Sequence, residues 1–202
     1  MQQVRLTTQI LFMHEIEPFF QWRDYYIASN DKLSPFYRRK YSEFQYTHAI
    51  YNHVIHPQWD DIDSETLFCK VLFADYEKGF TVIEFMGEWN DAIGNDIRTL
   101  RKELIDPMIE AGINKFILIG ENILNFHADD DSYYEDWYDE LKENDGWIMG
   151  INFRPHVVDE MRRHRLDHYI YMGERYNDIL WRKLKPFHTL QMAENLLFKA
   201  LE

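Results

Sequence analysis

Two short apolar runs constrain the fold more than any other feature of the sequence. Residues 115–119 and 147–152 are mostly consecutive apolar side chains without alternation, which is typical of strands covered on both faces. Between them, Ser132 and Glu135 have the spacing of a capping box, and the apolar stripe that follows predicts an amphipathic helix. Two buried strands joined through a helix predict a parallel crossover, and therefore an α/β sheet.

Further elements are predicted on both sides of this unit. Alternation over residues 67–73, a turn at 77–79 and a β-rich run at 81–89 predict a hairpin. The other predicted elements are a helix from Ile97 to Gly112 that Pro107 kinks or ends early, a helix that starts at Pro155, a strand at 169–172 and a closing helix at 190–200. From residue 66 the predicted order is β-β-α-β-α-β-α-β-α, a mixed sheet with helices.

The first third of the chain differs in composition from the rest. Residues 1–63 are rich in large aromatic side chains interleaved with charges, and such side chains need burial. Two helices are expected here, at 17–28 and at 42–55, with Pro57 ending the second. We therefore expect an aromatic-rich N-terminal segment, residues 1–63, packed on a main α/β domain, residues 64–202.

Charge and cysteine content exclude several classes of function. The 35 acidic and 22 basic residues give a net charge of -13, the wrong sign for binding nucleic acid or an anionic membrane surface. The single cysteine, Cys69, rules out an internal disulfide and is expected in the core. No apolar run approaches the ~20 residues of a membrane helix, and residues 1–9 lack a signal-peptide core. A cytoplasmic protein is expected.

Several segments of the second part resemble the STAS family, the domain of anti-sigma-factor antagonists and sulfate transporter tails. The similarity lies in the strand ending in Gly87-Glu88, the helix after it, the strand at 115–119, the helix opened by Ser132, and the stretches 151–158 and 165–169. It covers about residues 66–175. The resemblance implies a STAS-like fold and a regulatory module that binds a protein partner.

One departure from the family pattern concerns phosphorylation. Phosphorylatable members carry Asp-Ser-Ser-Gly at the start of a helix, where a serine accepts phosphate. The corresponding residues here are Asp129, Asp130, Asp131 and Ser132, so the tandem serines and the glycine are absent. Carboxylates at a helix start meet the helix dipole favourably without any switch. We expect Ser132 to be an N-cap, with phosphorylation of its hydroxyl as the alternative.

The helix opened by Ser132 is also the predicted contact surface. Tyr133, Tyr134, Trp137 and Tyr138 are of the residue types that anchor protein interfaces. The sequence thus favours a non-enzymatic interaction module that binds a protein partner or itself, with no nucleic acid, no membrane and no cofactor. The dense carboxylates of residues 129–145 do not match an EF-hand and are interpreted as a solvated helix face.

An enzyme is the alternative hypothesis. His53, His56 and Asp60 offer imidazole and carboxylate groups, the usual ligands of transition metals and the usual groups of acid/base catalysis. Their spacing fits no zinc motif, so no metal site is predicted. If they act together, the site of a small-molecule or metal-dependent enzyme lies between the N-terminal segment and the sheet.

Overall fold

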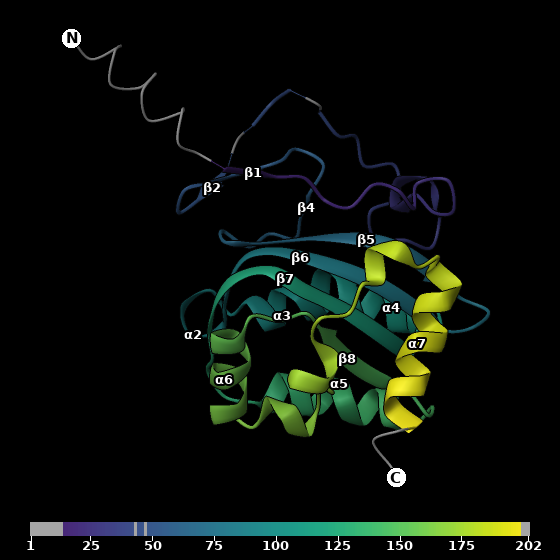
Figure 1. Ribbon diagram of the computed structural model, residues 1–202. Coiled ribbons are helices and arrows are strands. Elements are labelled where there is room, and N and C mark those ends of the chain that lie inside the picture. Colours follow the sequence, from purple (N-terminus) through teal and green to yellow (C-terminus); the bar gives the residue numbers. More distant parts are fainter. Residues whose placement is uncertain (1–13, 43, 47, 199–202) are drawn as a thin grey trace.

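A mixed five-stranded sheet forms the centre of the molecule (Figure 1). The computed structural model describes residues 14–42, 44–46 and 48–198. The sheet has the order β4 (Asp60–Asp61), β5 (Leu67–Asp75), β6 (Phe80–Asn90), β7 (Lys115–His127) and β8 (Trp147–Ile151). The pairs β4–β5 and β5–β6 are antiparallel, whereas β6–β7 and β7–β8 are parallel. The predicted α/β class with a mixed sheet is confirmed, as is the hairpin.

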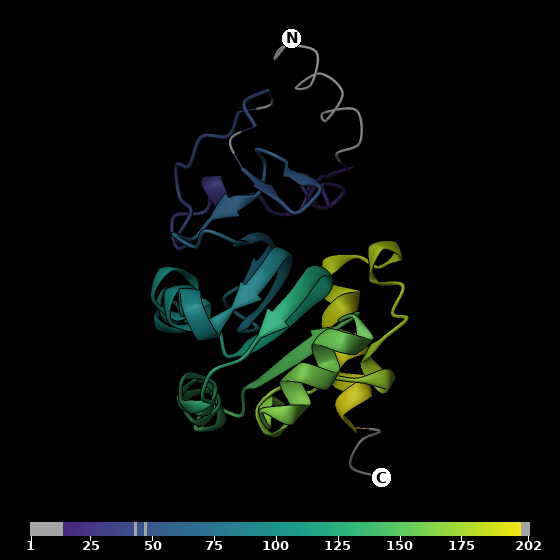
Figure 2. The ribbon, with the colours of Figure 1, turned by 90° about the vertical axis from the view of Figure 1, so that its left-hand side faces the viewer.

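Helices cover both faces of the sheet. On one face lie α2 (Asp91–Gly94), α3 (Asp96–Leu100), η2 (Arg101–Ile105), α4 (Asp106–Glu110), α5 (Ser132–Lys142) and α6 (Pro155–Arg163). The other face is covered by α7 (Pro186–Phe198), with the short 3-10 turns η4 (Glu174–Tyr176) and η5 (Trp181–Lys183). Figure 2 shows α7 on the opposite side of the sheet from α3 and α4. Both faces of the central strands are therefore buried, which explains their continuous apolar character.

Pro107 distorts the helix in which it lies. The helix predicted from Ile97 is a single run made of α3, a π-helical turn η2 and α4. In the π turn the Asp106 N–H bonds the carbonyl of Arg101, five residues back. Because Pro107 has no N–H to donate, the register changes just before it, as expected for a proline inside a helix.

The N-terminal segment contains strands and turns where two helices are predicted. The expected helix at 17–28 is a series of turns followed by the 3-10 turn η1 (Ala28–Asn30). The expected helix at 42–55 is wrong as well: β2 (Ala49–Ile50) and β3 (His53–Ile55) pair through a turn at Tyr51, whose φ of 52° is left-handed. β1 (His14–Ile16) completes a small sheet ordered β1-β3-β2. Residues 1–13, 43 and 47 lie outside the described residues.

The strand predicted at 169–172 is reduced to one bridge. Tyr171 pairs with Met149 of β8, and the chain then turns at Gly173, which has a φ of 109°. The preceding 3-10 turn η3 (Leu166–His168) leaves too few residues for a ladder. The last predicted helix is found, beginning earlier than predicted at Pro186 and running to Phe198; its predicted end at 199–200 lies outside the described residues. Among the described residues, no helix is long and apolar enough to cross a membrane.

The N-terminal segment lies along the β5 side of the sheet (Figures 1 and 2). Trp22, Phe36 and Trp59 are buried, and the Trp22 indole donates to the carbonyl of Leu184 at 3.0 Å. The Phe19 backbone N–H donates to the Glu84 carboxylate in β6 at 2.8 Å. These contacts tie the first third of the chain both to the sheet and to the segment before α7.

Candidate functional site

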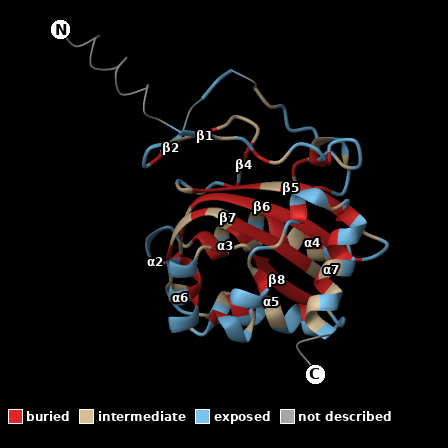
Figure 3. Cartoon of the chain, viewed as in Figure 1, coloured by how far each residue is buried: buried red, intermediate tan, exposed pale blue. Residues whose placement is uncertain are grey.

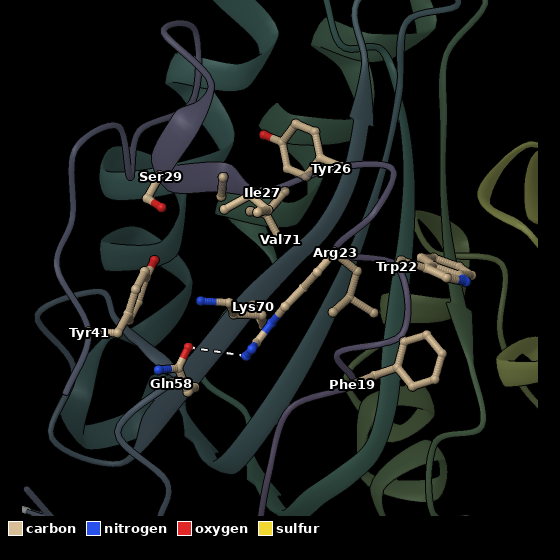
Figure 4. A pocket seen from close by; sticks show the side chains of 12 residues that line it. Phe19, Trp22, Arg23, Tyr26, Ile27, Ser29, Tyr41, Gln58, Lys70 and Val71 are labelled. Atoms are coloured by element: carbon tan, nitrogen blue, oxygen red, sulfur yellow. Dashed lines mark hydrogen bonds between the residues drawn. The ribbon is translucent and has the colours of Figure 1, made fainter. Parts of the chain in front are cut away.

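A small cavity lies between the N-terminal segment and β5 (Figure 4). Its volume is about 170 Å³. Lys70, Val71 and Leu72 of β5 line it from the sheet, and residues 19–29 form much of the wall around it. Arg23 reaches across the opening and donates to the side chain of Gln58 at 3.1 Å. This is the location at which the enzyme hypothesis expects a site.

The charges beside this cavity form an ion-pair cluster around Asp60. Its carboxylate is fully buried and lies 3.1 Å from Lys70 Nζ and 3.3 Å from Arg39 Nη1. The Tyr41 hydroxyl donates to it at 2.5 Å, and the Lys70 ammonium lies 3.8 Å from the centre of the Tyr41 ring. Burial lowers the pKa of Lys70, and the neighbouring Asp60 opposes that shift. The cluster joins residues 39–41 to β5, so its charged groups stabilise the position of the N-terminal segment on the sheet.

A second buried carboxylate, Glu84 of β6, binds both the N-terminal segment and the segment before α7. Its two oxygens accept hydrogen bonds from the Phe19 N–H, from Asn122 Nδ2 at 3.2 Å and from Arg182 Nη2 at 3.2 Å. Burial is the largest effect on this group and raises its pKa to about 7, although the three donors act in the opposite direction. Sequence reasoning missed Glu84; the available signal was a charge placed between the apolar residues Ile83 and Phe85.

Arg182 extends this cluster to the molecular surface. Its guanidinium also forms an ion pair with Glu121 and lies 4.4 Å from the centre of the Trp181 ring. Trp181 is buried and its indole donates to Glu121 at 3.2 Å. The residues before α7 thus share the Glu84 carboxylate with the N-terminal segment.

The residues of the enzyme hypothesis do not share one site. Asp60 belongs to the ion-pair cluster with Lys70 and Arg39. His56, by contrast, lies 3.5 Å from Glu15 and packs edge-on against Tyr46. His53 lies beside His14, with ring centres 5.7 Å apart, and lines a different cavity. In the described part of the chain, no three His, Cys, Asp or Glu side chains form a group that could hold a metal ion.

Two of the four expected contact residues on α5 belong to the core. Tyr134 and Trp137 are fully buried, and the Tyr134 hydroxyl donates to Asp91 at 2.6 Å. The helix turns these two rings toward the sheet because they continue the apolar stripe that ends at Leu141. Tyr133 and Tyr138 are half-buried, and Tyr138 lies 5.9 Å from the ring of Tyr169. Only the latter two tyrosines present surface to a partner.

The acidic loop before α5 differs in detail from the prediction. Asp131 occupies the N-cap position and Ser132 is the first helical residue. The Asp130 carboxylate accepts both the backbone N–H and the hydroxyl of Ser132, which closes a local turn one residue earlier than a serine cap would. These hydrogen bonds lower the pKa of Asp130. Ser132 is exposed, and Asp131 accepts a hydrogen bond from the Tyr169 hydroxyl at 3.1 Å.

Much of the N-terminal segment is exposed or half-buried (Figure 3), and the large apolar side chains that are exposed are concentrated in it. Of the twelve large apolar side chains exposed among the described residues, seven lie between residues 20 and 51. Phe20 and Tyr25 are each about half exposed, and Arg23 lies 6.0 Å from the ring centre of Phe20. We call Phe20, Tyr25, Ile27 and Leu33 the N-terminal apolar surface. The sequence predicts burial of the aromatic residues in this segment, which holds for only part of them.

Comparison with known proteins gives structural neighbours only. No family model matches the chain, and neither does any curated protein. The chain is similar to the anti-sigma factor antagonist SpoIIAA in its unphosphorylated form, with 11% identity and a TM-score of 0.43 over 63% of this chain and 96% of that chain. It is also similar to the phosphorylated Bacillus cell fate determinant SpoIIAA, with 10% identity and a TM-score of 0.40 over 62% and 98%. SpoIIAA is a STAS-domain protein, the family that the sequence resembles. At 10–11% sequence identity, the similarity concerns the path of the chain alone.

Proposed function

We propose that the protein is a non-enzymatic, STAS-like regulatory module that binds another protein chain and lacks a phosphorylatable serine switch. The observation that carries this proposal is the N-terminal apolar surface. Its side chains are exposed while Trp22 and Phe36 of the same segment are buried, so part of the segment packs on the protein and part is exposed, with Ile27 at the edge of the cavity beside β5. Clustered exposed apolar side chains mark protein interaction sites.

The residue types on this face suit a protein partner. Tyrosine, phenylalanine and arginine are enriched in protein interfaces, and Phe20, Arg23 and Tyr25 lie within one turn-rich stretch. The segment is fixed by the buried Asp60 and Glu84 clusters, which limits the entropy lost on binding. Tyr133 and Tyr138 on α5 are proposed as a second contact. A partner or a second copy of this chain could use either surface.

The absence of a serine switch rests on the loop before α5. A phosphate on Ser132 would lie beside the carboxylates of Asp130 and Asp131, and like charges repel at this distance. The Ser132 hydroxyl is already bonded to Asp130. The intact mass of the protein purified from its own cells tests this point: phosphate on Ser132 contradicts it, and an unmodified mass under all growth conditions agrees with it.

Site-specific photo-crosslinking tests the interaction surface. A photoreactive phenylalanine analogue replaces Tyr25, whose side chain is half exposed, and in a matched control replaces Ile93 on α2, which is 89% exposed. After irradiation in the native cells, we expect a discrete crosslinked product from position 25 and none from position 93. Mass spectrometry identifies the product as a partner or a second copy. Equal, diffuse crosslinking at both positions would overturn the proposal.

A further inference from the structure

A second cavity lies at the C-terminal end of β7, away from the ion-pair cluster around Asp60. It has a volume of about 430 Å³, within the range of small-molecule sites. It is lined by Tyr51, Asn52, His53, Leu124, Asn125, Arg154 and His156. These residues come from β3 and the turn before it, from the end of β7, and from the first turn of α6.

The lining of this cavity has the opposite charge to the molecule as a whole. It includes one arginine and two histidines but no carboxylate, in a chain of net charge -13. The nearby carboxylates are already engaged: Glu88 accepts from the Tyr51 hydroxyl and lies 3.3 Å from His127, and Glu121 is paired with Arg182. The cavity is therefore a local region that favours negative charge.

Arg154 is the main cationic group of the cavity. Its Nε donates to the carbonyl of Glu121 at 3.2 Å, which holds the guanidinium in place. Among the described residues, no carboxylate lies within ion-pair distance of Arg154, and its two terminal nitrogens donate no hydrogen bond. The side chain is half-buried. A fixed guanidinium with two free nitrogens is suited to bidentate binding of a carboxylate or a phosphate.

His53 lines the same cavity as Arg154. Its Nδ1 is buried and has no hydrogen-bond partner in the structure. Burial, His14 and Arg154 together lower the pKa of His53, so the imidazole and the guanidinium are close enough to interact electrostatically. Because this nitrogen is closed to solvent, a ligand in the cavity would meet it only after the imidazole ring turns toward the cavity.

We propose that this cavity binds a small oxyanion ligand, a carboxylate or phosphate compound, through the Arg154 guanidinium and the His53 imidazole. Arg154 also lines a larger cavity of about 700 Å³ on its other side. That cavity has mixed charges: besides Arg154 it is lined by Arg182 and Lys183 and by the carboxylates of Glu121 and Asp178, and Arg182 is already paired with Glu121, whereas the smaller cavity has no carboxylate in its lining. The smaller cavity is thus the anion site, and this proposal is independent of the N-terminal apolar surface.

Calorimetric titration of the full chain tests the site. The probes are inorganic phosphate and succinate, each matched in ionic strength with sodium chloride. We expect saturable binding of at least one probe, and the ratio of the two affinities distinguishes a phosphate ligand from a carboxylate ligand. Arg154→Gln should weaken that binding ~10-fold or more, as expected for loss of a bidentate charged contact. The matched control is Arg163→Gln on the same helix, an exposed arginine paired with Glu160, which should change affinity less than ~2-fold.

Two results would overturn the proposal. One is no saturable binding of either probe at concentrations up to tens of millimolar. The other is equal weakening by Arg154→Gln and Arg163→Gln, which would indicate non-specific charge screening. Circular dichroism and thermal unfolding verify that each variant is folded. If Arg154→Gln does not fold, His53→Gln takes its place, since it keeps the charge of the neutral histidine and changes only the hydrogen-bonding group.

Discussion

Glu84 is a buried carboxylate whose three partners all donate to it. Burial raises its pKa from an ordinary value of 4.5 to about 7. Between these pH values the folded state holds a proton that the unfolded state releases, so the contribution of Glu84 to stability falls as pH rises. The full effect is on the order of 3 kcal/mol above pH 7. The carboxylate is nevertheless needed for geometry, because Phe19, Asn122 and Arg182 require acceptors.

Glu84→Gln isolates this titration. Urea unfolding of both proteins at pH 5 and pH 8 gives the difference in unfolding free energy between wild type and variant. We expect this difference to fall by about 2 to 3 kcal/mol toward pH 8, because only the wild type titrates at this position. A difference that is constant, or that grows with pH, would show that Arg182 keeps the folded-state pKa at or below its ordinary value.

Asp60 is predicted to be structural rather than catalytic. Asp60→Asn leaves Lys70 and Arg39 without their carboxylate, and breaking a buried ion pair from one side costs on the order of 3 to 5 kcal/mol. The matched control is Asp61→Asn, since Asp61 is exposed and, within the described part of the chain, its side chain accepts a hydrogen bond only from the Asp63 N–H. Urea unfolding at pH 7 should show the large loss for Asp60→Asn alone. Comparable losses for the two variants would contradict the role given to Asp60.

At the residue scale, the partners of a side chain could not be predicted from the sequence. The sequence offered Asp60 only as a candidate metal or acid/base group of the alternative enzyme hypothesis, and it could not show that Lys70 and Arg39 would lie within ion-pair distance, because these contacts join distant parts of the chain. The same reason hides the cavity beside Arg154, which brings together residues 51–53, 124–125 and 154–156.

On α5, the helical periodicity separates the side chains that face the core from those at the surface. Trp137→Ala should lower the unfolding free energy by about 3 to 5 kcal/mol, because the indole is fully buried and packs edge-on against Phe116 at 5.2 Å. Tyr138→Ala, one residue later on the half-buried side, should cost about 1 kcal/mol or less. Chemical denaturation at pH 7 measures both. A similar cost for the two substitutions would contradict the assigned orientation of the helix.

Elements of the second part were predictable because their patterns are long and regular. The hairpin, the buried strands and α5, α6 and α7 all follow from period-2 or helical spacing. The N-terminal segment was not predictable in this way. Its strands have two or three residues, and left-handed residues such as Arg38 and Tyr51 turn the chain between them. Such short elements depend on distant contacts, including the Trp59 indole donating to the Ile16 carbonyl.

At the scale of the whole molecule, the N-terminal segment contacts the segment before α7. Trp22 contacts Trp181, with ring centres 5.7 Å apart, and donates to the Leu184 carbonyl. Phe19 contacts Trp181 at 4.9 Å and bonds Glu84, the carboxylate that also binds Arg182. The two segments therefore share their anchors, and loosening one should loosen the other even though about 160 residues separate them in sequence.

Trp22→Ala tests this coupling by hydrogen exchange and mass spectrometry. We expect faster exchange in peptides from residues 15–28 and also from residues 177–185, because both lose the same aromatic contact. Peptides from β6 to β8 should keep most of their protection, because their backbone ladders do not involve Trp22, although its ring belongs to the apolar cluster on the α7 side of the sheet. Ile93→Ala serves as the control and should leave both segments unchanged. Faster exchange confined to residues 15–28 would mean that the C-terminal segment is held by α7 and Glu121 alone, and that the two segments respond to a binding partner independently.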